Sequence, residues 1–229
     1  MKKLTLLALA ACSTFAVADF TQGFDDITTL GAAGWSQSNQ STAVGSSNWF
    51  QGNAAVFTAQ AGTLTTSYIG ANFNSTAGSG TETISNWLIT QTDTLQNGST
   101  FSFWTRTVDA PAFADRLEVR LSTAGASTNV GTGPAAVGDF TTLLATVNPS
   151  LTLAGYPNTW TQFNIVLSGL AAPTTGRFAF RYFVPNGGPL GANSDYIGVD
   201  TVNYQGVPEP ATMVVLGGLA VAAIRRKRK

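Results

Sequence analysis

Residues 177–183 read Arg-Phe-Ala-Phe-Arg-Tyr-Phe, and this stretch decides the fold class. Phe178, Phe180 and Tyr182 stand two residues apart, so in an extended chain their side chains lie on one face. A helix would spread the same side chains around its axis, because its period is 3.6 residues. The stretch is therefore predicted to be a strand with one buried face.

The same period of two recurs on both sides of this strand. Alternation runs through residues 101–106, 116–121, 162–167 and 196–204, with turn residues between the runs. Strands with one apolar and one polar face are typical of antiparallel sheets, and a single open sheet would leave an apolar face in water. We therefore predict one all-β domain over residues 19–206, a two-sheet antiparallel β-sandwich of the jelly-roll kind with about nine to eleven strands.

Charge in this domain is sparse and mostly acidic. Between Asp19 and Gly206 the chain has eleven acidic residues, five arginines and no lysine. This negative excess argues against a nucleic-acid partner. The whole chain has no histidine and one cysteine, Cys12. Histidine bases, Cys-His pairs, zinc sites built on these ligands and disulfides are therefore excluded.

The N-terminus reads as a secretory signal peptide over residues 1–18. Two lysines precede the apolar run 4–11, and Ala16-Val17-Ala18 forms a small-residue cleavage site. Signal peptidase is thus an expected processing partner, and Asp19 would begin the mature chain. A second interpretation takes Leu-Ala-Ala-Cys ending at Cys12 as a lipoprotein signal with an acylated cysteine. Both interpretations export the domain.

The C-terminal residues 207–229 have three parts in order. A Val-Pro-Glu-Pro motif is followed by an apolar run that ends at Ile224 and then by five consecutive basic residues. Counted from Ala211, the apolar run has 14 residues, about 21 Å of helix, against a hydrocarbon core of about 30 Å. Because the basic cluster resists translocation, we predict a short transmembrane helix whose C-terminus stays in the cytoplasm.

This three-part C-terminus resembles the PEP-CTERM sorting signal of Gram-negative bacteria that make exopolysaccharide. The resemblance implies recognition and cleavage by an exosortase, a transient stay in the inner membrane, and transfer to the cell surface or the extracellular matrix. Glu209 would then be read by the processing enzyme. A permanently membrane-anchored structural protein is the alternative. The motif residues are Val207, Pro208, Glu209 and Pro210.

Short motifs inside the domain follow the order of the choice-of-anchor J domain, a group similar to the cleaved-adhesin and MAM-type jelly rolls. The resemblance covers nearly all of residues 19–204. It implies an extracellular β-sandwich with an adhesive or matrix role. The motifs are Phe24-Asp25-Asp26, Gly34-Trp35, and residues 86–90, 116–122, 177–182 and 197–202.

Few residues are available for catalysis. A glycosidase needs two carboxyl groups roughly 5 to 10 Å apart, one of them with a raised pKa. The glutamates of the domain are Glu82, in a Gly-Ser-Thr loop, and Glu118, flanked by arginines on its own strand face. Since neighbouring arginines lower a carboxyl pKa, we interpret Glu118 as a cross-strand partner of arginines such as Arg106 or Arg181. We predict a protein that is not an enzyme; a secreted carbohydrate-active hydrolase is the alternative.

Calcium is the one cofactor that the residues suggest. Asp25 and Asp26 lie near the first strand and Asp200 lies in the last, and the terminal strands of a jelly roll often run side by side. Carboxylate oxygens suit Ca²⁺, and Asp26 and Asp200 are the preferred ligands of the three. The alternative is that the first two cap a turn and that Asp200 bonds backbone groups between strands.

Carbohydrate binding would use exposed aromatic rings beside polar side chains. Most large aromatics of a sandwich belong to its core. Trp49 and Phe50 follow a Gly-Ser-Ser-Asn run, so we predict that a loop carries this pair toward a ligand, and exopolysaccharide is the expected class. The other tryptophans are Trp35, Trp87, Trp104 and Trp160.

Overall fold

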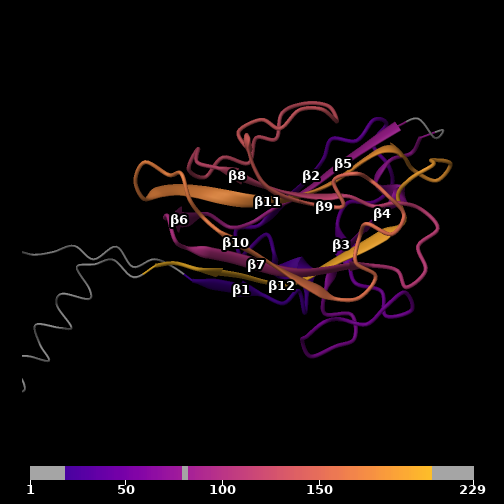
Figure 1. Ribbon diagram of the computed structural model, residues 1–229, viewed down its shortest axis with the longest axis horizontal. Coiled ribbons are helices and arrows are strands. Elements are labelled where there is room, and N and C mark those ends of the chain that lie inside the picture. Colours follow the sequence, from indigo (N-terminus) through magenta and orange to yellow (C-terminus); the bar gives the residue numbers. More distant parts are fainter. Residues whose placement is uncertain (1–18, 79–81, 208–229) are drawn as a thin grey trace, which may run out of the picture. The chain divides into compact units, whose positions relative to one another are not determined.

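The computed structural model describes residues 19–78 and 82–207 (Figure 1). The predicted signal peptide, with Cys12 and the cleavage site Ala16 and Ala18, lies outside the described residues. So does the predicted sorting signal after Val207, including Pro208, Glu209 and Pro210. Within the described ranges no helix has the length and hydropathy needed to cross a membrane.

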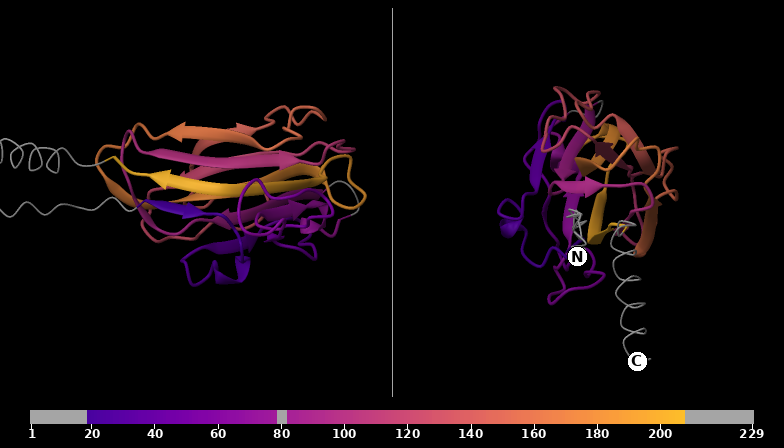
Figure 2. Two further views of the ribbon diagram at one scale, coloured as in Figure 1. Left: turned by 90° about the horizontal axis from the view of Figure 1, so that it is seen from below. Right: turned by 90° about the vertical axis from the view of Figure 1, so that its left-hand side faces the viewer.

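Residues 19–206 fold as two antiparallel sheets packed face to face, which confirms the predicted all-β sandwich (Figures 1 and 2). Sheet A has the order β10-β7-β12-β4-β3, with β1 on the second half of β12. Sheet B has the order β2-β5-β11-β8-β9, with β6 on the start of β11. The strands are β1 Phe20–Gln22, β2 Ser36–Asn39, β3 Phe50–Gln51, β4 Ile69–Asn72, β5 Glu82–Ile89, β6 Asp93–Leu95, β7 Thr100–Thr107, β8 Leu117–Ser122, β9 Thr142–Val147, β10 Thr161–Val166, β11 Thr174–Gly187 and β12 Tyr196–Gln205.

The stretch 177–183 forms the centre of β11, and its apolar face meets sheet A. The ring of Phe178 stacks on Phe101 of β7 with centroids 4.0 Å apart, and Phe180 packs edge-on against Phe103 at 5.0 Å. All four rings are fully buried. Burying a side chain of this size contributes about 1.5–3 kcal/mol, so these pairs are a main source of cohesion between the sheets.

The two terminal strands lie side by side, as expected for a jelly roll. Strand β1 runs along β12 (Figure 2), and Phe20 of β1 pairs with Tyr204 of β12. A bulge in β12 follows Asp200, and Thr201 there takes a φ of 45°, in the left-handed region. The bulge corrects the predicted alternation, because Val202 and not Thr201 takes the next inward position.

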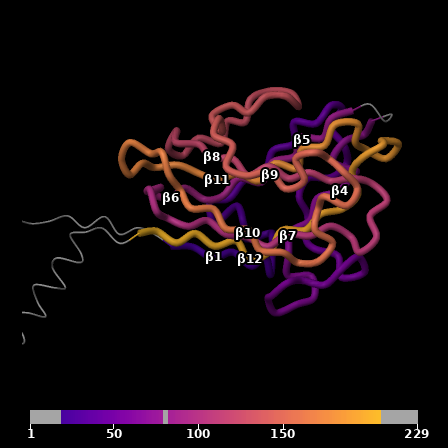
Figure 3. Tube along the Cα trace, in the orientation of Figure 1, coloured from indigo at the N-terminus to yellow at the C-terminus, as the bar shows by residue number. Residues whose placement is uncertain are grey.

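Each sheet is partly covered on its outer side by one long loop (Figure 3). Loop A, residues 53–67, lies over sheet A, where a Cβ on Gly198 would come within 2.8 Å of the Phe57 ring. Loop B, residues 123–141, lies over sheet B, where Val130 and Phe140 pack on Trp87. Each loop leaves other outward side chains of its sheet uncovered, and the candidate sites lie among those side chains.

Candidate functional site

Two of the predicted calcium ligands, Asp25 and Asp26, are exposed and bound to protein donors. Asp25 Oδ1 accepts hydrogen bonds from Ser67 Oγ at 2.5 Å and from Thr63 N at 3.0 Å. Asp26 Oδ1 accepts from Thr28 N at 2.9 Å and thereby caps a short 3-10 helix, Ile27–Thr29. Hydrogen bonds, first of all from Ser67 and Thr28 respectively, lower the pKa of each carboxyl.

The third predicted ligand, Asp200, is fully buried beneath loop A. Its Oδ2 accepts from the backbone N–H groups of Gln60 at 2.9 Å and Ala61 at 3.1 Å, and its Oδ1 accepts from Thr201 N at 2.6 Å. Burial raises the pKa of Asp200 to about 6. The carboxylate thus anchors the loop to the sheet.

Asp25, in the bend after β1, and Asp200, in β12, therefore hold the same segment, residues 60–67. This arrangement matches the alternative in which the aspartates serve turns and backbone groups. In residues 19–78 and 82–207 no three or more acidic, histidine or cysteine side chains gather as a metal site would require. Calcium binding at Asp25, Asp26 and Asp200 stays a prediction.

The predicted ligand-facing pair does not form a stacking surface. Trp49 is 3% exposed, and its indole N–H donates to the carbonyl of Asn86 at 3.2 Å. Phe50 begins β3 and packs edge-on against Tyr196 at 5.6 Å. The Gly-Ser-Ser-Asn run suggested a loop, but the indole after it turns inward, because burial removes its large apolar surface from water and a backbone carbonyl satisfies its N–H.

Trp104 is the tryptophan that the structure leaves available. Phe101 and Phe103 point into the core, so Trp104 points outward from β7 and is partly exposed. Among the described residues its ring takes part in none of the aromatic pairs, and its indole N–H donates to no protein acceptor. By contrast, the indole N–H groups of Trp87 and Trp160 donate to Ser85 Oγ and to the Thr58 carbonyl.

On its β10 side, Trp104 has uncharged polar neighbours; on β12 the buried Asp200 is directly opposite it, and Arg106 is the next outward residue of β7. Gln162 on β10 is directly opposite Trp104, and Asn164 is opposite Ser102 one step along; both amides are exposed. On the other side of β7, Asn203 of β12 pairs with Ser102, and its Nδ2 donates to Thr21 Oγ1 at 2.7 Å. We name Trp104, Gln162, Asn164 and Asn203 the Trp104 platform. Amides beside an aromatic face can bond sugar hydroxyls while the ring covers a sugar face.

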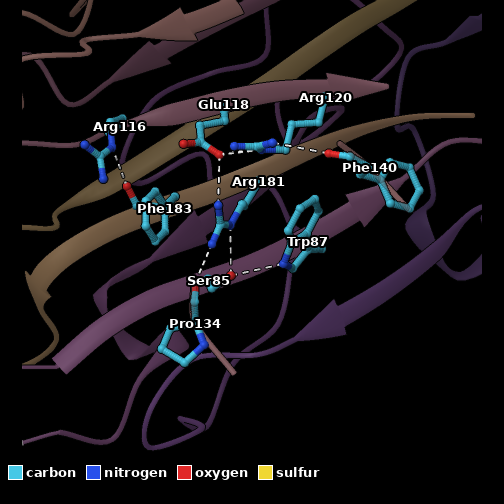
Figure 4. A network of polar contacts seen from close by, with 9 residues as sticks. All are labelled: Ser85, Trp87, Arg116, Glu118, Arg120, Pro134, Phe140, Arg181 and Phe183. Atoms are coloured by element: carbon cyan, nitrogen blue, oxygen red, sulfur yellow. Dashed lines mark hydrogen bonds and ion pairs between the residues drawn. The ribbon is translucent and has the colours of Figure 1, made fainter. Parts of the chain in front are cut away.

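Sheet B carries a different chemistry on its outer face (Figure 4). Glu118 Oε2 accepts from Arg120 Nε at 2.7 Å and from Arg181 Nη1 at 3.0 Å. Arg181 also donates to Ser85 Oγ at 3.0 Å and to the carbonyl of Pro134 in loop B. The predicted pairing of Glu118 with arginines is confirmed, but it is not on the surface: Arg181 is 2% exposed and Glu118 7%. Arg106 pairs elsewhere, with Asp109.

Arg116 lies at the open end of this network. Its Nε donates to the Phe183 carbonyl at 2.9 Å, and its guanidinium carbon lies 4.6 Å from the centre of the Phe183 ring. The guanidinium of Arg181 approaches the same ring at 3.7 Å. Alternation along β8 predicts which side chains share this face, but the loop that covers part of it comes from residues 123–141 and leaves no signal in the strand pattern.

The geometry offers little to a hydrolase. Glu118 Oε2 is shared by two guanidinium groups, those of Arg120 and Arg181. Glu82 begins β5, at the position opposite Gly187 at the far end of β11. The accessible groups on the described outer faces include the Trp104 ring, the amides beside it and the Arg116 guanidinium.

Three solved structures share this fold. The chain is similar to the K1 cleaved adhesin domain of Lys-gingipain from Porphyromonas gingivalis W83, with 22% identity and a TM-score of 0.53 over 83% of this chain and 99% of that domain. The K2 domain of Lys-gingipain is 21% identical, with a TM-score of 0.53 over 82% of this chain and 100% of that domain. The K3 domain is 18% identical, with a TM-score of 0.53 over 82% of this chain and 98% of that domain. No protein-family model and no curated protein matches the chain. The fold is that of a cleaved adhesin domain.

Proposed function

We propose that this chain is an exported, non-catalytic carbohydrate-binding module of the cell surface or the extracellular polysaccharide matrix. The Trp104 platform is the observation that carries the proposal. A large ring with a free indole N–H stands among amides on an open sheet face, and an exposed site of this composition suits an uncharged sugar chain.

Export and sorting are the second part of the proposal. The signal-peptide pattern of residues 1–18 and the motif, apolar run and basic tail of residues 207–229 support release from the inner membrane by an exosortase. The intact mass of the protein recovered from the cell exterior tests this part. A form that begins at Asp19 and has lost the basic tail is expected, and a form that keeps Lys229 contradicts sorting by cleavage.

The binding test compares the wild-type chain with Trp104→Ala against neutral oligosaccharides by calorimetry. We expect the substitution to weaken binding about tenfold or more, since a central aromatic contact is worth at least about 1.4 kcal/mol. Phe113→Ala is the matched control, because Phe113 is 41% exposed in a loop outside the platform. Equal losses in both variants, or no binding by the wild type, would contradict the proposal.

The hydrolase alternative is tested in the same samples. Release of reducing ends is measured beside the heat of binding, and a binding module gives heat without release. Turnover that is abolished by Glu118→Gln or Glu82→Gln would establish the hydrolase instead, because a glycosidase requires its carboxyl groups.

A further inference from the structure

The positive charge of the domain is concentrated on one face of sheet B. Between Asp19 and Gly206 the chain has five arginines and eleven acidic residues. Three of the five, Arg116, Arg120 and Arg181, surround Glu118 on the outer face of β8 and β11 (Figure 4). The domain is therefore acidic as a whole and basic at this one place.

Glu118 does not neutralise the three arginines. Its Oε2 is shared by Arg120 and Arg181, and one carboxylate balances one of the three positive charges. The acidic residue of loop B, Asp139, is engaged by Ser127 Oγ at 2.5 Å. Two positive charges remain in a cluster whose burial weakens screening by water.

Arg116 is the member of the cluster with both terminal donors free in the described chain, because Arg120 uses Nε on Glu118 and Nη1 on the Phe140 carbonyl. Arg181 uses Nε, Nη1 and Nη2 on Ser85, Glu118 and Pro134. Arg116 uses only its Nε, and within the described residues neither of its Nη atoms has a hydrogen-bond partner. Its side chain is partly exposed, and the Phe183 ring and carbonyl hold its plane.

We propose that Arg116 binds the carboxylate groups of an acidic polysaccharide, so that sheet B carries a second glycan site on the face opposite the Trp104 platform. The two free Nη groups form a planar fork that matches a carboxylate, and the fixed plane reduces the entropy lost on binding. The choice of a polysaccharide rests on the proposed function; the choice of an acidic one rests on the arginines.

The number of uncompensated charges near Arg116 indicates which class of anionic polymer fits the site. Two uncompensated charges suit separate carboxylates carried on successive sugars. A nucleic acid presents a phosphate about every 1.7 Å of duplex and would meet the acidic remainder of the domain. The Arg116 site is therefore expected to bind weakly and to lose affinity as salt is added, because exposed charges are screened.

The test measures binding of the full chain, purified in detergent, to polygalacturonate and to the same polymer after chemical reduction of its carboxyl groups. The wild type should bind the acidic form about tenfold more tightly at low salt, and Arg116→Gln should abolish that preference. Arg106→Gln is the matched control, since it removes one arginine from the sheet A side, where Arg106 pairs with Asp109. Arg116→Lys keeps the charge without the fork and should retain only part of the preference.

Each outcome decides the matter. A preference that survives Arg116→Gln, or that Arg106→Gln removes equally, overturns the assignment to Arg116. A wild type that prefers dextran sulfate over dextran but ignores polygalacturonate overturns the carboxylate. Binding of neutral sugars that needs Trp104 but shows no acidic preference leaves the proposed function standing without this second site, whereas a chain that binds neither kind overturns both. Thermal unfolding shows whether Arg116→Gln is folded. If it is not, the preference for the acidic polymer is compared between the wild type and Arg116→Lys.

Discussion

The two outer faces of the sandwich have the same construction and opposite chemistry. On sheet A a buried carboxylate, Asp200, accepts backbone N–H groups of loop A. On sheet B a buried guanidinium, Arg181, donates to a backbone carbonyl of loop B. Each loop covers part of its sheet and leaves one group uncovered, Trp104 on one side and Arg116 on the other. The comparison indicates that a buried charge of either sign can help to position a long loop, together with Asp25 on sheet A and with Arg120, which donates to the Phe140 carbonyl, on sheet B.

The largest effect is expected where the charge network is most enclosed. Arg181→Met removes a guanidinium that is 2% exposed and leaves Glu118 buried with one partner fewer. We expect a loss of about 3–5 kcal/mol in the free energy of unfolding, measured by urea denaturation. Arg106→Met, at a pair whose Asp109 is exposed, should cost at most about 1 kcal/mol. Similar losses in the two variants would show that loop B does not enclose the network.

A smaller effect is expected in the pH dependence of the unfolding free energy, to which the buried carboxylate of sheet A contributes and the buried guanidinium of sheet B does not. Burial raises the pKa of Asp200 to about 6, and likewise that of Asp115, which accepts from Tyr182 Oη and Thr107 Oγ1. A raised folded-state pKa means that the folded chain binds more protons than the unfolded chain. The stability from these groups is therefore full below about pH 4 and is lost as pH rises to about 6.

Asp200→Asn tests how much of this decrease in stability with rising pH comes from the buried carboxylate of sheet A. The decrease in unfolding free energy between pH 4 and 7 should become smaller by up to about 3 kcal/mol, with Asp115 accounting for the remainder. Arg181→Met should leave the pH dependence unchanged, since burial lowers the pKa of Arg181 only to about 10. A pH profile identical in the wild type and Asp200→Asn would contradict the role of the buried carboxylate.

The smallest effect is expected at an exposed carboxylate beyond both loops. Asp26→Ala removes the cap of the 3-10 helix Ile27–Thr29 and should lower the melting temperature only slightly, less than either buried substitution does. Its pKa is lowered by Thr28, so this contribution is present above about pH 4 and disappears at lower pH, the reverse of Asp200. Thr142→Ala, at an exposed β9 position, is the control for a surface substitution. A fall in melting temperature as large as that caused by Asp200→Asn would mean that Asp26 does more than cap this turn.

The sequence predicts the strands and their side-chain directions better than it predicts which outward side chains are covered. Alternation in 177–183 and 116–121 correctly places Phe178 inward and Glu118 outward, because a strand's side-chain direction depends on local geometry alone. The burial of Trp49 and the enclosure of Arg181 depend on contacts with Asn86 and Pro134, far along the chain. The bulge at Thr201 likewise shifts one strand's alternation through its pairing with another. Such non-local contacts leave no period in the sequence.

The pairing of β1 with β12 brings the beginning and the end of the domain together. The backbone N–H of Gly206 donates to Asp19 Oδ1 at 2.7 Å, so the first and last residues of the fold are joined by a hydrogen bond. The described strands all lie between Phe20 and Gln205. Trimming the chain on either side of the fold should thus leave the melting temperature nearly unchanged, and a domain closed in this way could accept a new partner protein fused at either end without remodelling its sheets.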